Sequence, residues 1–207
     1  MLQTQTVEPR TFSILRELME IPEMQDFHLV GVTALSLLYG HRISEDLDLF
    51  TNIKFENETV ANSLTKKFED NIIIRSSSNF GIFSFIENVK VDIIRFPHPF
   101  IRPIQIIDGI RMFSVEDIIA MKVQAILGRG KKKDFWDVAE LLDHYTVADF
   151  VKFHKEKYTT QNLLITVPQA ITYFDDADES EDPTSLKNQT WQSVKNKIQK
   201  KVRQYLV

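Results

Sequence analysis

Two acidic residues separated by a single residue, Asp46 and Asp48, are the first feature of the chain that could do chemistry. In a β-strand alternate side chains point to the same face, so both carboxylates would share one face while Leu47 and Leu49 turn to the core. Carboxylates held this close repel each other unless a divalent cation lies between them. Oxygen ligands suit Mg²⁺ or Mn²⁺ rather than zinc. The spacing alone leaves open a second interpretation, two solvated acids on a strand edge.

The residues that precede these acids predict a phosphate site. A strand over residues 27–30 is followed by Gly31 and a short helix, and exposed N–H groups at a helix N-terminus bind phosphate. Gly31 would let the backbone approach closely, and Thr33 could donate its hydroxyl. Arg42 is placed for a phosphate, and Ser44 for orienting the acidic loop. The segment therefore combines a phosphate cradle with a pair of metal ligands.

Asp92 adds a third carboxylate. It interrupts an otherwise apolar strand over residues 89–96, where a charge is costly unless it is paired or metal-bound. The polar face of a half-exposed strand would explain it equally well. We expect Asp46, Asp48 and Asp92 to converge on one site, because carboxylates on neighbouring strands beside a phosphate cradle are what two-metal phosphoryl chemistry requires.

Cations in the second half of the chain could complete such a site. Lys122 lies among apolar neighbours in a helix, and Arg129 follows it on a turn flanked by glycines. We expect both to reach a cleft between a sheet-bearing half and a helical half, where positive charge would stabilise a leaving pyrophosphate. The alternative is an ordinary ion pair of Lys122 with Glu116 or Asp117. The rim of the cleft would carry two further residues, Lys133 and Asp134.

The composition sets the general class of the protein. Of 207 residues 43% are hydrophobic, which is enough for a packed core, and the formal charge of −4 gives no overall attraction to nucleic acid. The absence of cysteine excludes disulfides and cysteine zinc sites. No apolar run spans a bilayer, and the N-terminus lacks a signal pattern, so we expect a cytoplasmic protein with no membrane contact.

The order of patterns predicts an α+β fold, with a mixed sheet and flanking helices followed by a helical C-terminal half. We place the boundary so that residues 1–110 form an α/β core and residues 111–207 a helical subdomain. Ser114 and Asp117 form a capping box at the start of the second part. The last helix bears several lysines, and a solvated face explains them better than RNA binding. The expected elements are helices over 11–19, 33–39, 58–68, 114–127 and 133–145, then two or three more of which the final one covers 191–205, strands over 27–30, 46–50, 71–76, 80–87 and 89–96, an irregular crossover from Pro97, and an acidic loop over 175–182.

Several segments together resemble the AbiEii-type nucleotidyltransferase-like toxins, a branch of the DNA polymerase beta-like nucleotidyltransferase superfamily. These are Gly31-Val-Thr-Ala-Leu35, Gly40-His-Arg-Ile-Ser-Glu-Asp-Leu-Asp-Leu-Phe50, Val91-Asp92, Lys122-Val-Gln-Ala-Ile-Leu-Gly-Arg129 and Lys133-Asp-Phe-Trp-Asp137.

The resemblance implies transfer of a nucleoside monophosphate from an NTP to an acceptor hydroxyl, with Mg²⁺ or Mn²⁺ as cofactor. Asp46 and Asp48 would be the metal ligands and Asp92 the third carboxylate. Lys122 would hold the triphosphate, and Asp134 matches a further acid of the family. The resemblance also implies an RNA or other acceptor, and a toxin with an antitoxin partner or a role in phage defence.

One residue departs from the superfamily pattern, because Val32 stands where Gly or Ser is usual. Two alternatives therefore remain at this point. One is a nucleotide-binding regulator that has lost turnover, and the other is a transferase that modifies a small molecule such as an antibiotic. The retained acids and Lys122 favour an enzyme over a regulator.

Overall fold

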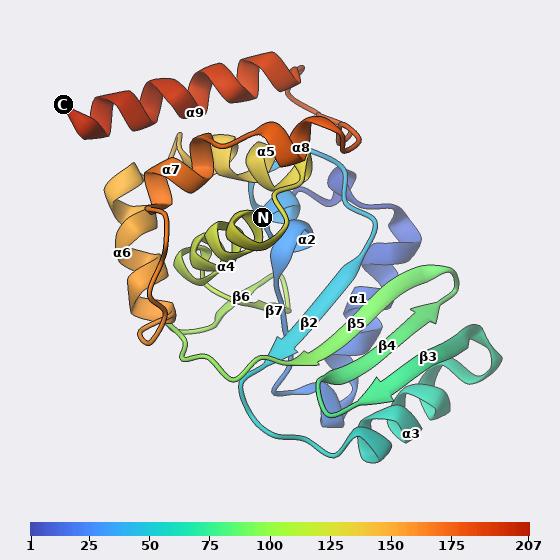
Figure 1. Ribbon diagram of the computed structural model, residues 1–207. Coiled ribbons are helices and arrows are strands. Elements are labelled where there is room, and N and C mark those ends of the chain that lie inside the picture. Colours follow the sequence, from blue (N-terminus) through green and yellow to red (C-terminus); the bar gives the residue numbers. More distant parts are fainter. The chain divides into compact units, whose positions relative to one another are not determined.

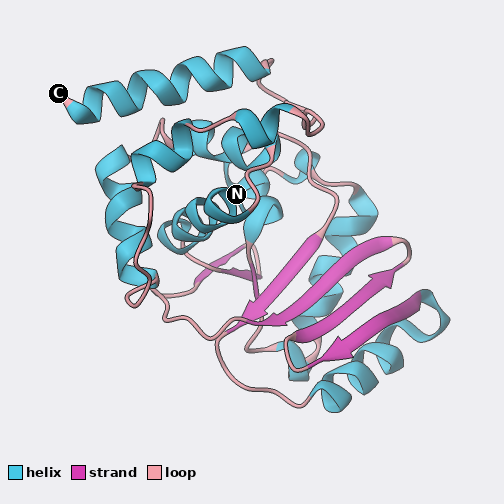
Figure 2. Ribbon diagram, viewed as in Figure 1, coloured by secondary structure: helices cyan, strands magenta, loops and turns pink.

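The computed structural model describes residues 1–207, and the chain divides into two compact units (Figures 1 and 2). The sheet unit contains all seven strands, and the helical unit contains helices only. This arrangement confirms the expected α+β class with a mixed sheet. None of the helices has both the length and the apolar character that a membrane span requires. The sheet unit comprises Met1–Gly40, Ser44–Pro99 and Pro103–Phe113, and the helical unit His41–Ile43, Phe100–Arg102 and Ser114–Val207.

One mixed sheet with the strand order β3-β4-β5-β2-β1-β7-β6 organises the sheet unit. β2 pairs with β5 in parallel and with β1 in antiparallel orientation, so β2 lies inside the sheet. The helices of this unit are α1 (Pro9–Glu20), α2 (Gly31–Tyr39) and α3 (Asn57–Phe68), with short 3₁₀ turns at Thr4–Thr6, Pro22–Met24 and Glu69–Asn71. The strands are β1 (His28–Leu29), β2 (Leu47–Thr51), β3 (Ile72–Ser78), β4 (Gly81–Ile86), β5 (Val89–Arg95), β6 (Gln105–Ile107) and β7 (Ile110–Met112).

The two central strands follow the alternation that the sequence predicts. In β2, Leu47 and Leu49 are fully buried, whereas Asp48 between them is only half-buried. In β5, Val91 and Ile93 are likewise fully buried. These apolar residues belong to the core, so the side chains between them turn to the other face of the sheet.

Two short strands lie in the region expected to be an irregular crossover. β6 and β7 form an antiparallel hairpin, and Leu29 of β1 pairs in parallel with Met112 of β7. Asp108 and Gly109 at the turn both have positive φ angles, 50° and 81°. An Asp-Gly pair is a strong signal for a two-residue hairpin turn. The expectation was wrong here because strands of three residues show no readable periodicity, although the turn itself was visible in the sequence.

The helical unit consists of α4 (Val115–Gly128), α5 (Lys132–Leu141), α6 (Val147–Lys157), α7 (Val167–Thr172), α8 (Asp175–Asp178) and α9 (Trp191–Leu206). Half of the expected capping box is present, since the Ser114 hydroxyl accepts a hydrogen bond from the Asp117 N–H at 3.1 Å. The Asp117 carboxylate instead accepts from the Ser114 hydroxyl and from the Ile101 N–H. α9 buries Val194, Ile198 and Val202 and packs on α5 and α7. The first half of the expected acidic loop is instead the short helix α8.

Candidate functional site

Asp48 and Asp92 are neighbours in the sheet. Their Cα atoms are partners in the parallel register of β2 and β5, and Leu47 and Leu49 pair with Val91 and Ile93 on either side. Partners in a sheet point to the same face. The structure therefore brings two of the three predicted carboxylates together on the face opposite the core. Asp46 directly precedes β2, and Asp46, Asp48 and Asp92 together form what we call the acidic trio.

Gly31 allows the Asp48 carboxylate to approach the start of α2. Its φ angle is +70°, a conformation that L side chains rarely adopt. A Cβ added to Gly31 would lie 3.1 Å from Asp48 Oδ2. The N-terminal end of a helix carries partial positive charge, which favours a nearby carboxylate. Gly31 is thus required both by the backbone turn and by the space that Asp48 occupies.

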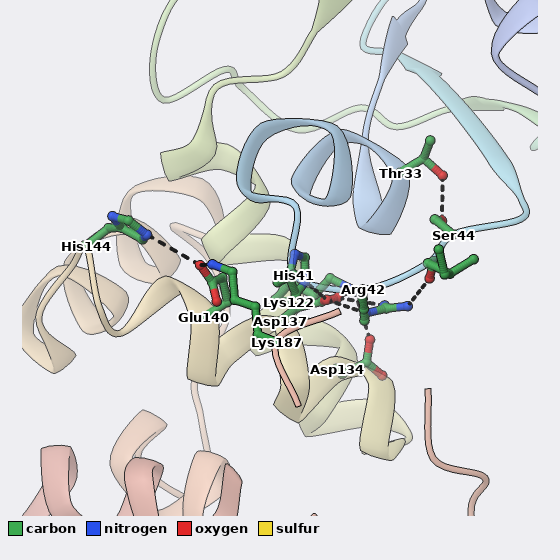
Figure 3. A network of polar contacts seen from close by, with 11 residues as sticks. Thr33, His41, Arg42, Ser44, Lys122, Asp134, Asp137, Glu140, His144 and Lys187 are labelled. Atoms are coloured by element: carbon green, nitrogen blue, oxygen red, sulfur yellow. Dashed lines mark hydrogen bonds and ion pairs between the residues drawn. The ribbon is translucent and has the colours of Figure 1, made fainter. Parts of the chain in front are cut away.

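Thr33 and Ser44 are held inside the protein. Their hydroxyl oxygens lie 2.7 Å apart in a buried hydrogen bond (Figure 3). The Thr33 hydroxyl also donates to the Asp46 carbonyl oxygen. Both side chains are buried. The contact ties α2 to the segment that leads into β2. The structure thus places Ser44 beside the segment that leads into β2, and the hydroxyl of Thr33 bonds to the backbone of Asp46 in that segment.

Lys90 lies beside the acidic trio, at a position that no sequence pattern predicts. Its Nζ donates a hydrogen bond of 2.5 Å to Asp92 Oδ2. Burial by itself would lower the pKa of the Lys90 ammonium, but the hydrogen bond to Asp92 and the charge of that carboxylate raise the pKa above its ordinary value. The charges of Asp48 and Asp46 act in the same direction. The Lys90 ammonium thus interacts electrostatically with all three carboxylates of the acidic trio.

The acidic trio offers oxygen donors of the kind that Mg²⁺ or Mn²⁺ takes. Asp92 is 7% exposed, and its Oδ1 is buried without a hydrogen-bond partner. No group of three or more His, Cys, Asp or Glu side chains is close enough to form a complete metal centre. Mg²⁺ characteristically uses one or two carboxylates together with substrate phosphates. The pair of Asp48 and Asp92 therefore fits a metal that arrives with a nucleotide better than a permanently bound ion.

A second polar cluster lies within the helical unit and is called the Lys122 network. Lys122 Nζ lies 2.6 Å from Asp137 Oδ2 and 3.1 Å from Asp134 Oδ1 (Figure 3). The Arg42 guanidinium donates two hydrogen bonds to the Asp137 carboxylate, of 2.7 Å and 3.1 Å. His41 Nε2 lies 2.8 Å from Asp137 Oδ1. All five side chains are buried. The partners of Lys122 are therefore these two acids rather than Glu116 or Asp117.

The electrostatics of the Lys122 network follow from dense opposite charge in a buried place. Burial by itself would raise the pKa of Asp137, but Arg42 and Lys122 hold it well below its usual range. Burial would lower the pKa of Lys122, but Asp137 and Asp134 raise it. Both groups are thus charged across the neutral range. Removing either one would leave uncompensated charge in the interior.

The other predicted residues of this region differ in exposure. Arg129 is 57% exposed, and its Nε lies 3.7 Å from Asp134 Oδ2. Lys133 is half-buried at the start of α5. Arg42 is expected from the sequence to bind a phosphate. In the structure its guanidinium is buried and donates two hydrogen bonds to the Asp137 carboxylate instead. Of these cations, Arg129 presents the most surface to a ligand.

The structure makes two residues prominent to which the sequence assigned no role: Lys90, and Asp137, which stood only as the last residue of the Lys133–Asp137 segment. Asp137 follows Asp134 by three positions in α5, so both acids share one helix face, and this spacing was the available signal. Lys90 precedes Asp92 by two positions in β5 and therefore shares its face. A lysine two residues from an acid in a strand is too common to be informative without the register.

Comparison with known proteins assigns the chain to a family. Residues 13–204 match the family described as nucleotidyl transferase AbiEii toxin of type IV toxin–antitoxin systems. The chain belongs to the AbiEii family. The match covers both units, and it confirms the resemblance read from the Gly31–Phe50 and Lys122–Asp137 segments. This AbiEii-family protein is a nucleotidyltransferase.

The AbiEii-family chain is also similar to individual proteins over nearly its whole length. An uncharacterised protein of Aquifex aeolicus is 30% identical over 200 residues, covering 93% of this chain and 94% of the relative. A crystal structure of a candidate nucleotidyltransferase from Helicobacter pylori superposes with a TM-score of 0.59 at 20% identity, covering 95% of each chain. The structure of JHP933 from Helicobacter pylori superposes with a TM-score of 0.61 at 19% identity, covering 99% of this chain and 93% of that chain. The two structures share the fold of this chain.

Proposed function

We propose that this AbiEii-family protein transfers a nucleoside monophosphate from an NTP to an acceptor hydroxyl in a metal-dependent reaction. The acceptor oxygen attacks the α-phosphorus, and the bond from that phosphorus to the bridging oxygen breaks. Pyrophosphate leaves with the electron pair of the broken bond. The proton of the attacking hydroxyl passes to a carboxylate of the acidic trio, which acts as general base.

The register pairing of Asp48 with Asp92 carries this proposal. It presents two carboxylates on one sheet face beside the start of α2, with Asp46 just before the strand. Asp48 and Asp92 would hold the divalent cation, and Asp46 would complete its surroundings. A bound Mg²⁺ or Mn²⁺ would offset the negative charge of the phosphates and of the departing pyrophosphate. The exposed N–H groups at the start of α2, opened by Gly31, would accept a phosphate.

The residues of the helical unit have a supporting place in the proposal. We assign Lys122 to the charge balance of the triphosphate, acting with Asp134 and Asp137 as its fixed partners. Arg129 and Lys133 are the cations proposed for phosphate contact, since Arg129 is largely exposed. Arg42 acts by holding Asp137, and Thr33 with Ser44 acts by holding the Asp46 backbone.

The biological setting proposed for this chain follows from the family. The family description names toxins of type IV toxin–antitoxin systems. We therefore propose that the protein is the toxin of such a pair, that an antitoxin protein counters it in the cell, and that RNA supplies the acceptor hydroxyl. A small-molecule acceptor is the competing outcome of the experiment below.

Labelled nucleotide tests the function directly. Wild-type protein is incubated with each α-labelled NTP, Mg²⁺ and total RNA, beside Asp48→Asn and the exposed-site control Asp70→Asn. We expect label in RNA from wild type and Asp70→Asn, and none with Asp48→Asn or with EDTA. Label confined to small molecules would move the acceptor to that class. Binding of nucleotide without transfer by folded wild-type protein, with any acceptor fraction, would contradict the proposal.

A further inference from the structure

Lys90 forms an ion pair with Asp92 of the acidic trio, and the position of this lysine is set by the sheet. Val91 pairs with Leu47 and Asp92 pairs with Asp48, so Lys90 is level with the start of β2, next to Asp46. Lys90 and Asp92 are two positions apart in one strand and share a face. The ammonium group therefore lies on the same face as the carboxylates, with a 2.5 Å contact to Asp92.

An ammonium at this position has a clear electrostatic effect. Neighbouring carboxylates disfavour each other's charge, and a cation beside them relieves the repulsion. The Lys90 side chain is 42% exposed, whereas that of Asp92 is 10% exposed. The lysine is thus anchored at its strand but can move its head group into solvent, while the carboxylate stays in place. A partly exposed ion pair of this kind is weak enough to be exchanged.

A divalent ion that enters the same site competes with this lysine. Mg²⁺ in nucleotide-using sites takes only one or two carboxylates and obtains its other ligands from phosphates and water. A free ion would have to displace the Lys90 ammonium and would gain only one or two carboxylate ligands from the protein in return. An ion that arrives with a nucleotide brings phosphate ligands and gains more from the exchange.

We propose that Lys90 is the resident counter-ion of the acidic trio and exchanges its place with the divalent metal, so that the site resists free metal and accepts metal with nucleotide. This inference rests on the proposed function, since it concerns the metal site of that reaction. Lys90 is a positioning residue in this role, because it does not touch the reacting atoms and acts only by competing with the metal for the carboxylates of Asp92 and Asp48. It makes metal binding depend on the substrate.

Metal affinity without nucleotide separates this role from a merely structural one. Free Mn²⁺ is titrated by electron paramagnetic resonance against wild type, Lys90→Gln and the matched control Lys66→Gln, an exposed lysine of α3. Loss of a competing ion pair should tighten Mn²⁺ binding about fivefold in Lys90→Gln. Lys66→Gln, which changes the net charge equally, should bind as wild type does. Equal or weaker Mn²⁺ binding by folded Lys90→Gln overturns the proposal, as does an equal gain in both variants.

Amine labelling of the wild-type protein gives a second measurement that needs no variant. Acetic anhydride is applied with and without saturating Mn²⁺, and the modification of Lys90 is followed by mass spectrometry relative to Lys66. Exchange predicts faster labelling of Lys90 when Mn²⁺ is bound, whereas unchanged or slower labelling opposes it. Metal-dependent transfer with unchanged Mn²⁺ affinity in Lys90→Gln would leave the proposed function standing and remove this inference. Absence of Mn²⁺ binding even with nucleotide would remove both.

Discussion

Asp48 and Asp92 are partners in the parallel pairing of β2 with β5, although they lie far apart in the chain. The partnership places two carboxylates on one face of the sheet, with Lys90 bonded to one and Gly31 making room for the other. Such clustering of like charge opposes folding unless it is compensated. A site of this kind is built for binding rather than for stability.

Replacing either carboxylate should therefore separate activity from stability. We expect Asp48→Asn to lower nucleotidyl transfer about a hundredfold or more, because a metal ligand supplies several kcal/mol of charge stabilisation. Its free energy of unfolding should stay within about 1 kcal/mol of wild type or rise, since one repulsion is relieved. Urea unfolding and initial rates measure the two quantities. An inactive variant that is also strongly destabilised would show that Asp48 is structural.

Divalent metal should control how nucleotide stabilises the protein. At a nucleotide concentration about a hundredfold above the dissociation constant, binding should add about 2.7 kcal/mol to the free energy of unfolding. We expect this gain with Mg²⁺ or Mn²⁺ and its loss with EDTA, measured by thermal unfolding. Equal shifts under both conditions would argue against a metal that bridges Asp48 and Asp92 to the phosphates.

Gly31 and Gly109 form a matched pair for testing the crowding of Asp48. Both have positive φ angles, but a Cβ on Gly31 would meet Asp48 Oδ2 at 3.1 Å, whereas one on Gly109 would meet no atom within 4 Å. Each Ala substitution should cost about 1–2 kcal/mol of backbone strain. We expect only Gly31→Ala to weaken Mn²⁺–nucleotide binding as well. Unaltered binding by folded Gly31→Ala would show that Asp48 does not need this space.

Loss of Lys122 should destabilise the helical unit. Lys122→Ala leaves Asp134 and Asp137 with less positive charge in a buried place, and breaking such a pair typically costs about 3–5 kcal/mol. The control Lys152→Ala removes a surface pair with Glu156 at 4.0 Å and should cost under about 1 kcal/mol. Urea unfolding of both variants checks this. A fully stable Lys122→Ala protein without activity would instead assign the lysine to the nucleotide alone.

The depressed pKa of Asp137 predicts an acid limb in stability. Its pKa is lowered in the folded protein, so its stabilising contribution is complete above the unfolded value of about 3.9 and is lost as pH falls through the folded value. The difference in unfolding free energy between wild type and Asp137→Asn should therefore be constant near neutral pH and shrink below about pH 4. Asp143→Asn, which removes only the surface pair with Lys197, should show little difference at any pH. A difference that grows in acid would contradict the sign.

The sequence by itself determined the local features of the molecule. The alternation around Asp48 predicts a strand with this acid turned away from the core, and Ser114 predicts the start of α4; both are found, although the strand begins at Leu47 and leaves Asp46 just before it. Gly31 as the point where a strand turns into a helix was equally readable. These features depend on side-chain period and on backbone freedom, which act within a few residues.

Tertiary structure decided which residues meet. The pairing of Asp48 with Asp92 depends on the register of two distant strands, and one step of slip would turn one carboxylate toward the core. The same register brings Lys90 to the acidic trio. Arg42 and Asp137 form a buried hydrogen-bonded pair although they lie 95 residues apart in the chain. No local sequence pattern encodes a contact at such a separation. The sequence therefore shows which charged residues are present, whereas long-range packing determines which of them pair.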